Sequence, residues 1–290
     1  MKSIFDKIFF YIVFLLFVSS NCYAQHNEIG AFLGGAYYLG DINPGKQFYN
    51  SKPTLGLILR HNFNPRVSIR LNAFDGTVAA SDAQTKVNVI RNLSFRSNVA
   101  ELSTQIEINF LPYLPGKSGY TFTPYVFGGF AVFKFNPQAN YEGQWYDLQP
   151  MQTEGENTPY HRISMAIPFG FGFKFNIAKS VSLNLEWGLR RTYTDYLDDV
   201  SKTYVDPSTF NSAISANLAD RSPEVGEPNN KINSQRGNSR NDDWYSFFGV
   251  MVMFKIHDPK AECSAFNKEN KYKRYIRILN LKKLNFFNLF

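Results

Sequence analysis

The chain has 290 residues, a formal net charge of +7 and an aromatic content of 17%. The charge is concentrated at one end, because residues 258–290 hold eight Lys or Arg against three acidic residues, whereas residues 25–257 are close to neutral. This distribution argues against a nucleic-acid-binding face. No apolar run reaches the roughly 20 residues that a membrane-spanning helix needs.

Residues 1–24 have the pattern of an export signal, with two early lysines followed by an apolar run that is too short to cross a bilayer as a helix. The pattern predicts cleavage between Ala24 and Gln25. Acylation of Cys22 is a less favoured alternative, because the polar residues before it make a poor lipid-attachment sequence. Cleavage would leave Cys263 as the single cysteine, so no intramolecular disulfide is expected.

Beyond the signal, apolar residues alternate with polar ones at a period of two, in segments of about ten residues separated by turn-forming residues. This pattern predicts β-strands that each carry one apolar face. The eight predicted strands cover residues 28–39, 54–63, 67–73, 101–110, 122–135, 163–176, 181–190 and 244–256. In the fifth and eighth of these segments both faces are apolar, so the sequence does not assign their inner and outer faces.

The connections between these strands alternate between long and short. The long ones cover residues 40–53, 75–92, 136–160 and 196–242, and tight turns lie between them. This alternation predicts an all-β fold, an eight-stranded antiparallel up-and-down transmembrane barrel of the bacterial outer membrane with long extracellular loops. Both ends of the barrel, residues 25–257, and the basic tail, residues 258–290, would then be periplasmic. The long loops are polar, and we expect them to lie in water.

The polar faces of the strands place charged side chains inside the barrel. An eight-stranded barrel has room only for side chains in its lumen, and an unpaired charge there is costly. We therefore expect a structural network of ion pairs that plugs the barrel, with Arg60 as a further candidate. The predicted network consists of Arg70, Glu101, Glu107, Lys174, Glu186 and Arg190. Paired carboxylates also occur in hydrolases, but the structural interpretation needs only the same residues and is favoured.

The sequence predicts neither a metal centre nor a cofactor. The histidines lack metal-ligand spacing; they are His26, His61, His161 and His257. A weak candidate for catalysis at the outer rim is His161 with Asp195 and Asp198. We assign no catalytic residue and expect a protein that is not an enzyme.

Two stretches are distinctive. Residues 28–44 read EIGAFLGGAYYLGDINP, and residues 186–201 read EWGLRRTYTDYLDDVS. With residues 123–137 and 167–176, they resemble the PorG-like barrels of the type IX secretion system of Bacteroidota. The resemblance covers residues 28–256 and leaves the tail from residue 261 unmatched.

The resemblance implies a non-enzymatic outer-membrane component of the type IX protein secretion machinery. Its implied partners are the outer-membrane lipid and the periplasmic ring proteins of that machinery, and no catalytic residue carries over from the family. The alternative is a small surface-binding, adhesin-like barrel that acts through its long outer loops.

Overall fold

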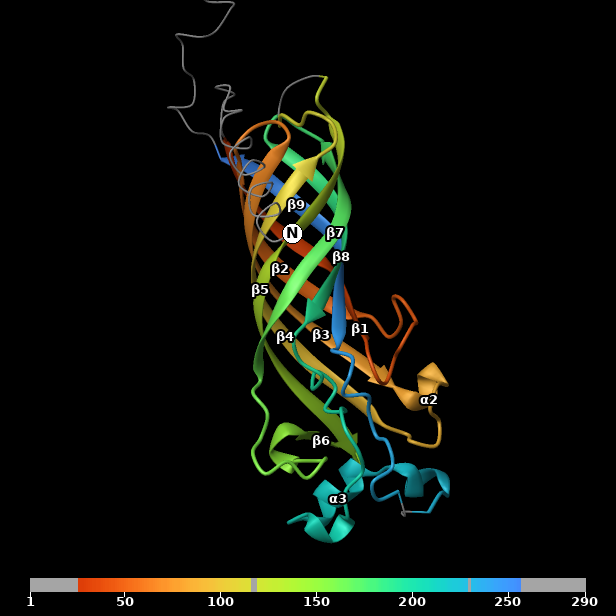
Figure 1. The fold of residues 1–290 in the computed structure, drawn as a ribbon. Coiled ribbons are helices and arrows are strands. Elements are labelled where there is room, and N and C mark those ends of the chain that lie inside the picture. Colours follow the sequence, from red (N-terminus) through yellow and green to blue (C-terminus); the bar gives the residue numbers. More distant parts are fainter. Residues whose placement is uncertain (1–25, 116–118, 229–230, 257–290) are drawn as a thin grey trace, which may run out of the picture.

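The computed structural model describes residues 26–115, 119–228 and 231–256. The expected signal, its cleavage site at Ala24 and Gln25, and the basic tail lie outside these residues. Figure 1 shows the described chain as a barrel with tight turns at one end and the long connections at the other.

Eight long strands form the barrel wall. They are β1 (His26–Leu39), β2 (Lys52–Asn62), β3 (Val67–Ser81), β4 (Ser94–Asn109), β5 (Phe122–Tyr141), β7 (Ile163–Asn176), β8 (Val181–Thr192) and β9 (Trp244–Ile256). Each strand pairs antiparallel with the next, and β1 also pairs with β9, which closes the sheet. The predicted eight-stranded antiparallel barrel is therefore confirmed. A short additional strand, β6 (Gln144–Asp147), forms a hairpin with the outer end of β5.

Three strands, β3, β4 and β5, continue further outward than the sequence pattern predicts, and β4 begins at Ser94 rather than near residue 101. Strand β3 ends at Ser81 rather than near residue 73, and β5 ends at Tyr141 rather than near residue 135. The predicted loops at residues 75–92 and 136–160 were therefore wrong at their starts. The reason is physical: beyond the lipid the outer face turns polar at Asp75, so the alternation fades, while the hydrogen-bonded pairing with β4 continues.

The structure resolves the inner and outer faces of the two ambiguous strands. Phe133 in β5 and Tyr245 in β9 are buried, whereas Val132 in β5 and Phe254 in β9, on the opposite faces of the same strands, are exposed. Apolar side chains on both faces thus serve two environments, since one face meets lipid and the other fills the lumen.

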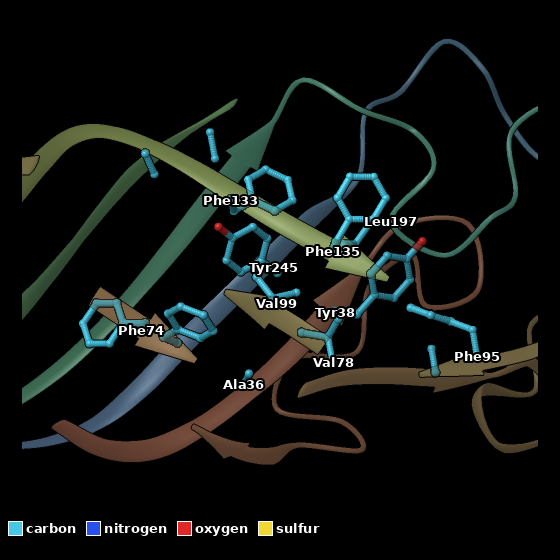
Figure 2. Close-up of a cluster of buried hydrophobic side chains, with 14 of the residues drawn as sticks. Ala36, Tyr38, Phe74, Val78, Phe95, Val99, Phe133, Phe135, Leu197 and Tyr245 are labelled. Atoms are coloured by element: carbon cyan, nitrogen blue, oxygen red, sulfur yellow. The ribbon is translucent and has the colours of Figure 1, made fainter. Parts of the chain in front are cut away.

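An aromatic cluster fills the half of the lumen nearer the long loops (Figure 2). The ring centroids of Phe133 and Tyr245 lie 5.2 Å apart, and those of Tyr38 and Phe95 lie 4.9 Å apart with near-perpendicular planes. Phe74 packs edge-on against Phe32 at 5.0 Å. Side chains from opposite walls therefore meet across the barrel, as the narrow lumen of eight strands requires.

The outer wall carries an apolar belt. Leu33, Leu57 and Ile106 each expose more than half of their surface. Along β4 the outward residues from Ala100 to Phe110 are apolar apart from a threonine, which is about 34 Å along the strand and about 26 Å along the axis at a tilt of about 40°. That height matches the apolar band of roughly 25 Å in outer-membrane barrels.

Short helices lie in the long connections, at the end of the barrel that is extracellular in proteins of this construction (Figure 1). They are α2 (Asp82–Thr85), η1 (Gln149–Met151), η2 (Pro207–Thr209), α3 (Ala213–Ala219) and η3 (Ser222–Val225). In residues 26–115, 119–228 and 231–256, no helix is both long and apolar enough to cross a membrane.

Candidate functional site

The lumen holds a balanced set of buried charges, most of them on the periplasmic side of the aromatic cluster and one pair within it. All six residues of the predicted network are buried there, together with Arg60 and Glu28. The four cationic side chains are Arg60, Arg70, Lys174 and Arg190, and the four carboxylates are Glu28, Glu101, Glu107 and Glu186. The polar faces of six different strands supply these residues, so the network joins opposite walls of the barrel.

Glu107 in β4 is the centre of this network. Its carboxylate lies 2.6 Å from Lys174 Nζ, 2.9 Å from Arg60 Nε and 3.2 Å from Arg70 Nη1. It also accepts a hydrogen bond of 2.9 Å from the hydroxyl of Ser68. A single carboxylate thus compensates charges from β2, β3 and β7.

Two further carboxylates extend the network. Glu28 pairs with Arg60 at 2.7 Å, and Glu186 pairs with Arg70 at 2.6 Å while accepting a hydrogen bond of 2.6 Å from the Tyr125 hydroxyl. Sequence reasoning did not select Glu28, because the alternation in that segment is interrupted by glycines. Glu28 lies two residues before Gly30 and therefore on the same inward face of β1, and this spacing could have identified it.

The pair of Arg190 and Glu101 lies apart from the Glu107 group, within the aromatic half. Their ion pair measures 3.1 Å, and the Tyr245 hydroxyl donates to the same carboxylate at 2.8 Å. The guanidinium also lies 4.5 Å from the ring centroid of Phe247. A cation held between a carboxylate and an aromatic face is compensated in two ways.

A second polar cluster closes the extracellular mouth. The hydroxyl oxygen of Tyr38 lies 2.5 Å from Asp198 and 2.7 Å from Asp243, and all three side chains are buried. A hydroxyl has one proton to donate, so the second contact requires a proton on a carboxyl group. Burial raises the pKa of Asp198 and of Asp243 well above the usual range, which supplies that proton.

Two buried arginines lock the outer loops together. Arg91 in the second outer loop pairs with Asp82 at 2.7 Å and donates to the backbone carbonyl of Arg236 in the fourth. Arg236 in turn pairs at 3.0 Å with Glu154 of the third loop. The expectation that the long loops lie in water was therefore wrong in part, because their inner residues form an ordered, buried cap.

The rim residues considered for catalysis do not come together as a catalytic group. His161 is exposed, and within the described residues no hydrogen bond or ion pair joins it to Asp195 or Asp198. Burial raises the pKa of Asp195 to about 8, and the groups that act on it are the Ser201 hydrogen bond and other acids rather than a histidine. The part of the chain that the structure describes contains no group of three or more His, Cys, Asp or Glu side chains arranged to hold a metal ion.

Sequence comparison identifies the family. Residues 6–220 match the model described as "Domain of unknown function (DUF6089)". The chain belongs to the DUF6089 family. A comparison of this DUF6089 protein with curated proteins finds no match.

Several solved structures resemble the DUF6089 barrel at low identity. The attachment invasion locus protein Ail of Yersinia pestis, solved with a heparin analogue, is 9% identical over 80% of this chain and 97% of its own, with a TM-score of 0.37. OprG of Pseudomonas aeruginosa is 13% identical over 81% and 98%, with a TM-score of 0.40. A major outer membrane protein of Thermus thermophilus is 13% identical over 81% and 100%, with a TM-score of 0.39. At these TM-scores the fold rests on the strand pairing alone.

The geometry of the DUF6089 barrel itself defines its environment. A closed strand ladder leaves no backbone group unpaired toward lipid, and the wall is apolar where the lumen is charged. Apolar side chains outside and charged side chains inside are the reverse of a water-soluble protein, and they suit a protein surrounded by hydrocarbon. The protein is located in the outer membrane.

Proposed function

We propose that this protein is a non-enzymatic outer-membrane component of the type IX protein secretion machinery and that it associates with the periplasmic ring of that machinery. The main support is that the two distinctive stretches, residues 28–44 and 186–201, meet in space. Inside the barrel Tyr38 donates to Asp198, and on the outer wall the Trp187 indole donates to the Tyr37 hydroxyl at 2.9 Å. The motifs that carry the resemblance therefore act as one structural unit.

The filled lumen supports a role as an anchor rather than as a conduit. The Glu107 network occupies the periplasmic part of the lumen and the aromatic cluster occupies the rest. A plugged barrel offers solutes no path, so we expect no ion conductance from the purified protein in planar bilayers. Stepwise conductance would show that the plug opens and would contradict this role.

Deletion of the gene tests the proposal directly. We expect type IX cargo to accumulate inside the cell and secretion to return when the wild-type gene is supplied. Co-purification from solubilised outer membrane should recover the periplasmic ring proteins with the barrel. Unchanged cargo secretion in the deletion strain would overturn the proposal.

A surface-binding role is a second candidate, because the second outer loop exposes apolar side chains. Val87, Val89 and Ile90 each expose at least half of their surface, although they lie at the extracellular end. Replacing all three by serine would abolish binding to a surface partner and leave cargo secretion intact if this role is the correct one. Loss of secretion in the same variant would instead favour the first proposal.

A further inference from the structure

The lipid-facing wall is hollowed at one place. A groove of about 360 Å³ lies over β7, β8 and β9, and Phe171, Trp187, Phe248 and Val250 line it. These residues alternate with the inward residues of their strands, so their side chains point away from the lumen. Phe171 and Val250 lie near the middle of the outward runs of β7 and β9, and Trp187 and Phe248 lie slightly nearer the extracellular end, so the groove lies around the middle of the apolar belt.

The first outer loop builds one rim of this groove. Phe48 of this loop packs onto the outside of the barrel, where its ring centroid lies 5.0 Å from that of Phe248 and 6.0 Å from that of Trp187. Phe48 has φ = 58°, a left-handed conformation that is unfavourable for an aromatic residue. The Tyr37 hydroxyl holds the loop in place by donating to Gln47 at 2.5 Å. Because specific contacts fix this disfavoured conformation, the rim formed by Phe48 is an ordered part of the structure.

The position of the groove indicates what occupies it. The groove is continuous with the belt that faces the membrane, and its side chains offer no partner for water. Arg191 lies four residues beyond Trp187 on the same face of β8, about 13 Å along the strand and therefore about 10 Å nearer the extracellular surface at a tilt of about 40°. Arg191 is exposed and has no ion pair among the described residues. Trp244 lies beside it in the register, as aromatic residues do at a membrane interface.

We propose that the groove binds one acyl chain of a phosphate-bearing lipid of the extracellular leaflet, whose headgroup contacts Arg191. A second copy of the protein fits less well, because a stable protein interface buries roughly 1,200–2,000 Å² of well-matched surface and Phe48 projects from this wall. The inference is independent of the proposed secretion role.

Native mass spectrometry of the full-length protein, extracted in mild detergent, tests the site. We expect a monomer that carries one lipid. Val250→Phe fills the groove and should reduce the lipid-bound fraction by about tenfold, since excluding two methylene groups has an effect of that size. The matched control is Val252→Phe, on the same face of β9 but outside the groove, which should keep the lipid.

A loop variant tests the same site in case the strand variant does not fold. Phe48→Ala removes the rim without altering a strand and should also release the lipid. Adding back a phospholipid or diacylglycerol then tests the headgroup contact, because Arg191→Ala should weaken the phospholipid adduct alone. A dimer in place of the lipid adduct, a lipid-free wild-type monomer, or equal lipid loss from the Val250 and Val252 variants would each overturn the proposal.

Discussion

The lumen and the extracellular cap both bury charged side chains, but they neutralise them in different ways. The lumen contains four cations and four carboxylates, and each cation has a carboxylate within 3.2 Å. The buried charges of the cap and mouth are six carboxylates and two guanidiniums. They are Asp82, Glu154, Asp198, Asp199, Asp220 and Asp243, with Arg91 and Arg236.

The excess of acids in the cap changes its chemistry. In the lumen every buried charge has an oppositely charged partner. In the cap two arginines pair with only some of the carboxyl groups, and the others rely on hydrogen bonds from hydroxyl and backbone N–H groups and on protonation. Asp199 is an example, because it accepts from Thr153 and Tyr160 and lies 3.8 Å from Arg236, yet burial still raises its pKa to about 7. We therefore expect the lumen to respond to the loss of a charge and the cap to respond to pH.

Glu107→Gln should have the largest effect. The substitution keeps the shape of the side chain and removes the charge that compensates Lys174, Arg60 and Arg70. Removing one partner of a buried ion pair destabilises by about 3–5 kcal/mol. Urea unfolding in lipid vesicles measures the free energy of unfolding, with Glu142→Gln in an exposed turn as the control. A loss below about 1 kcal/mol would show that the charge of Glu107 does not stabilise the fold by compensating the three cations.

Tyr38→Phe should have an intermediate effect that is confined to the mouth. It deprives Asp198 and Asp243 of their shared hydroxyl, and leaving buried acceptors unsatisfied costs about 1–3 kcal/mol. We expect faster proteolysis of residues 193–243 with little change in the barrel. The control is Tyr49→Phe, since the hydroxyl of Tyr49 makes an exposed contact with a backbone carbonyl. Equal protease resistance in both variants would show that the contacts of the Tyr38 hydroxyl do not hold the mouth closed.

Raising the pH should weaken the cap. Asp195 and Asp199 have pKa values of about 8 and about 7 in the folded protein, above the value of about 3.9 expected when unfolded. The folded state therefore holds protons that the unfolded state releases, so the stabilisation is complete below about pH 4 and is lost as the pH rises through 7–8. The thermal midpoint should fall between pH 5.5 and pH 9. Asp195→Asn should lessen that fall, and an undiminished fall would show that Asp195 does not contribute.

The exposed pair of Arg162 and Asp147 should have the smallest effect. Its atoms lie 3.8 Å apart, and both side chains are more than a third exposed. Surface ion pairs contribute about 0–1 kcal/mol. Arg162→Ala should change the free energy of unfolding by less than about 0.5 kcal/mol, measured as for Glu107→Gln. A larger change would contradict the expectation that exposed ion pairs contribute much less to stability than buried ones.

The strand count, the parity of the loops and the inward set of charges could be predicted because the period of two is fixed by backbone geometry. The outward residues Leu57 and Ile106 had to be apolar, and Glu107 on the opposite face had to find partners. Strand ends were less accessible, because pairing between β3 and β4 continues past Asp75 without lipid to impose a pattern.

The mouth and the cap could not be predicted, because their contacts join residues far apart in the chain. Tyr38 meets Asp243 across 205 positions, and Arg91 meets Arg236 across 145. A polar loop sequence has the same composition whether its charges are solvated or buried against one another. Only the closure of the barrel, which brings all four loops to one rim, decides between these states.

The outward extension of β5 also determines how far the protein stands above the cell surface. From Lys134, the first charged residue on its lipid-facing side, the strand continues to Tyr141, about 23 Å along its length. At the opposite end two turns, residues 63–66 and 177–180, have four residues each, and a longer connection joins β4 to β5. Macromolecules outside the cell therefore meet a raised platform, whereas a periplasmic partner meets two short turns and the connection between β4 and β5.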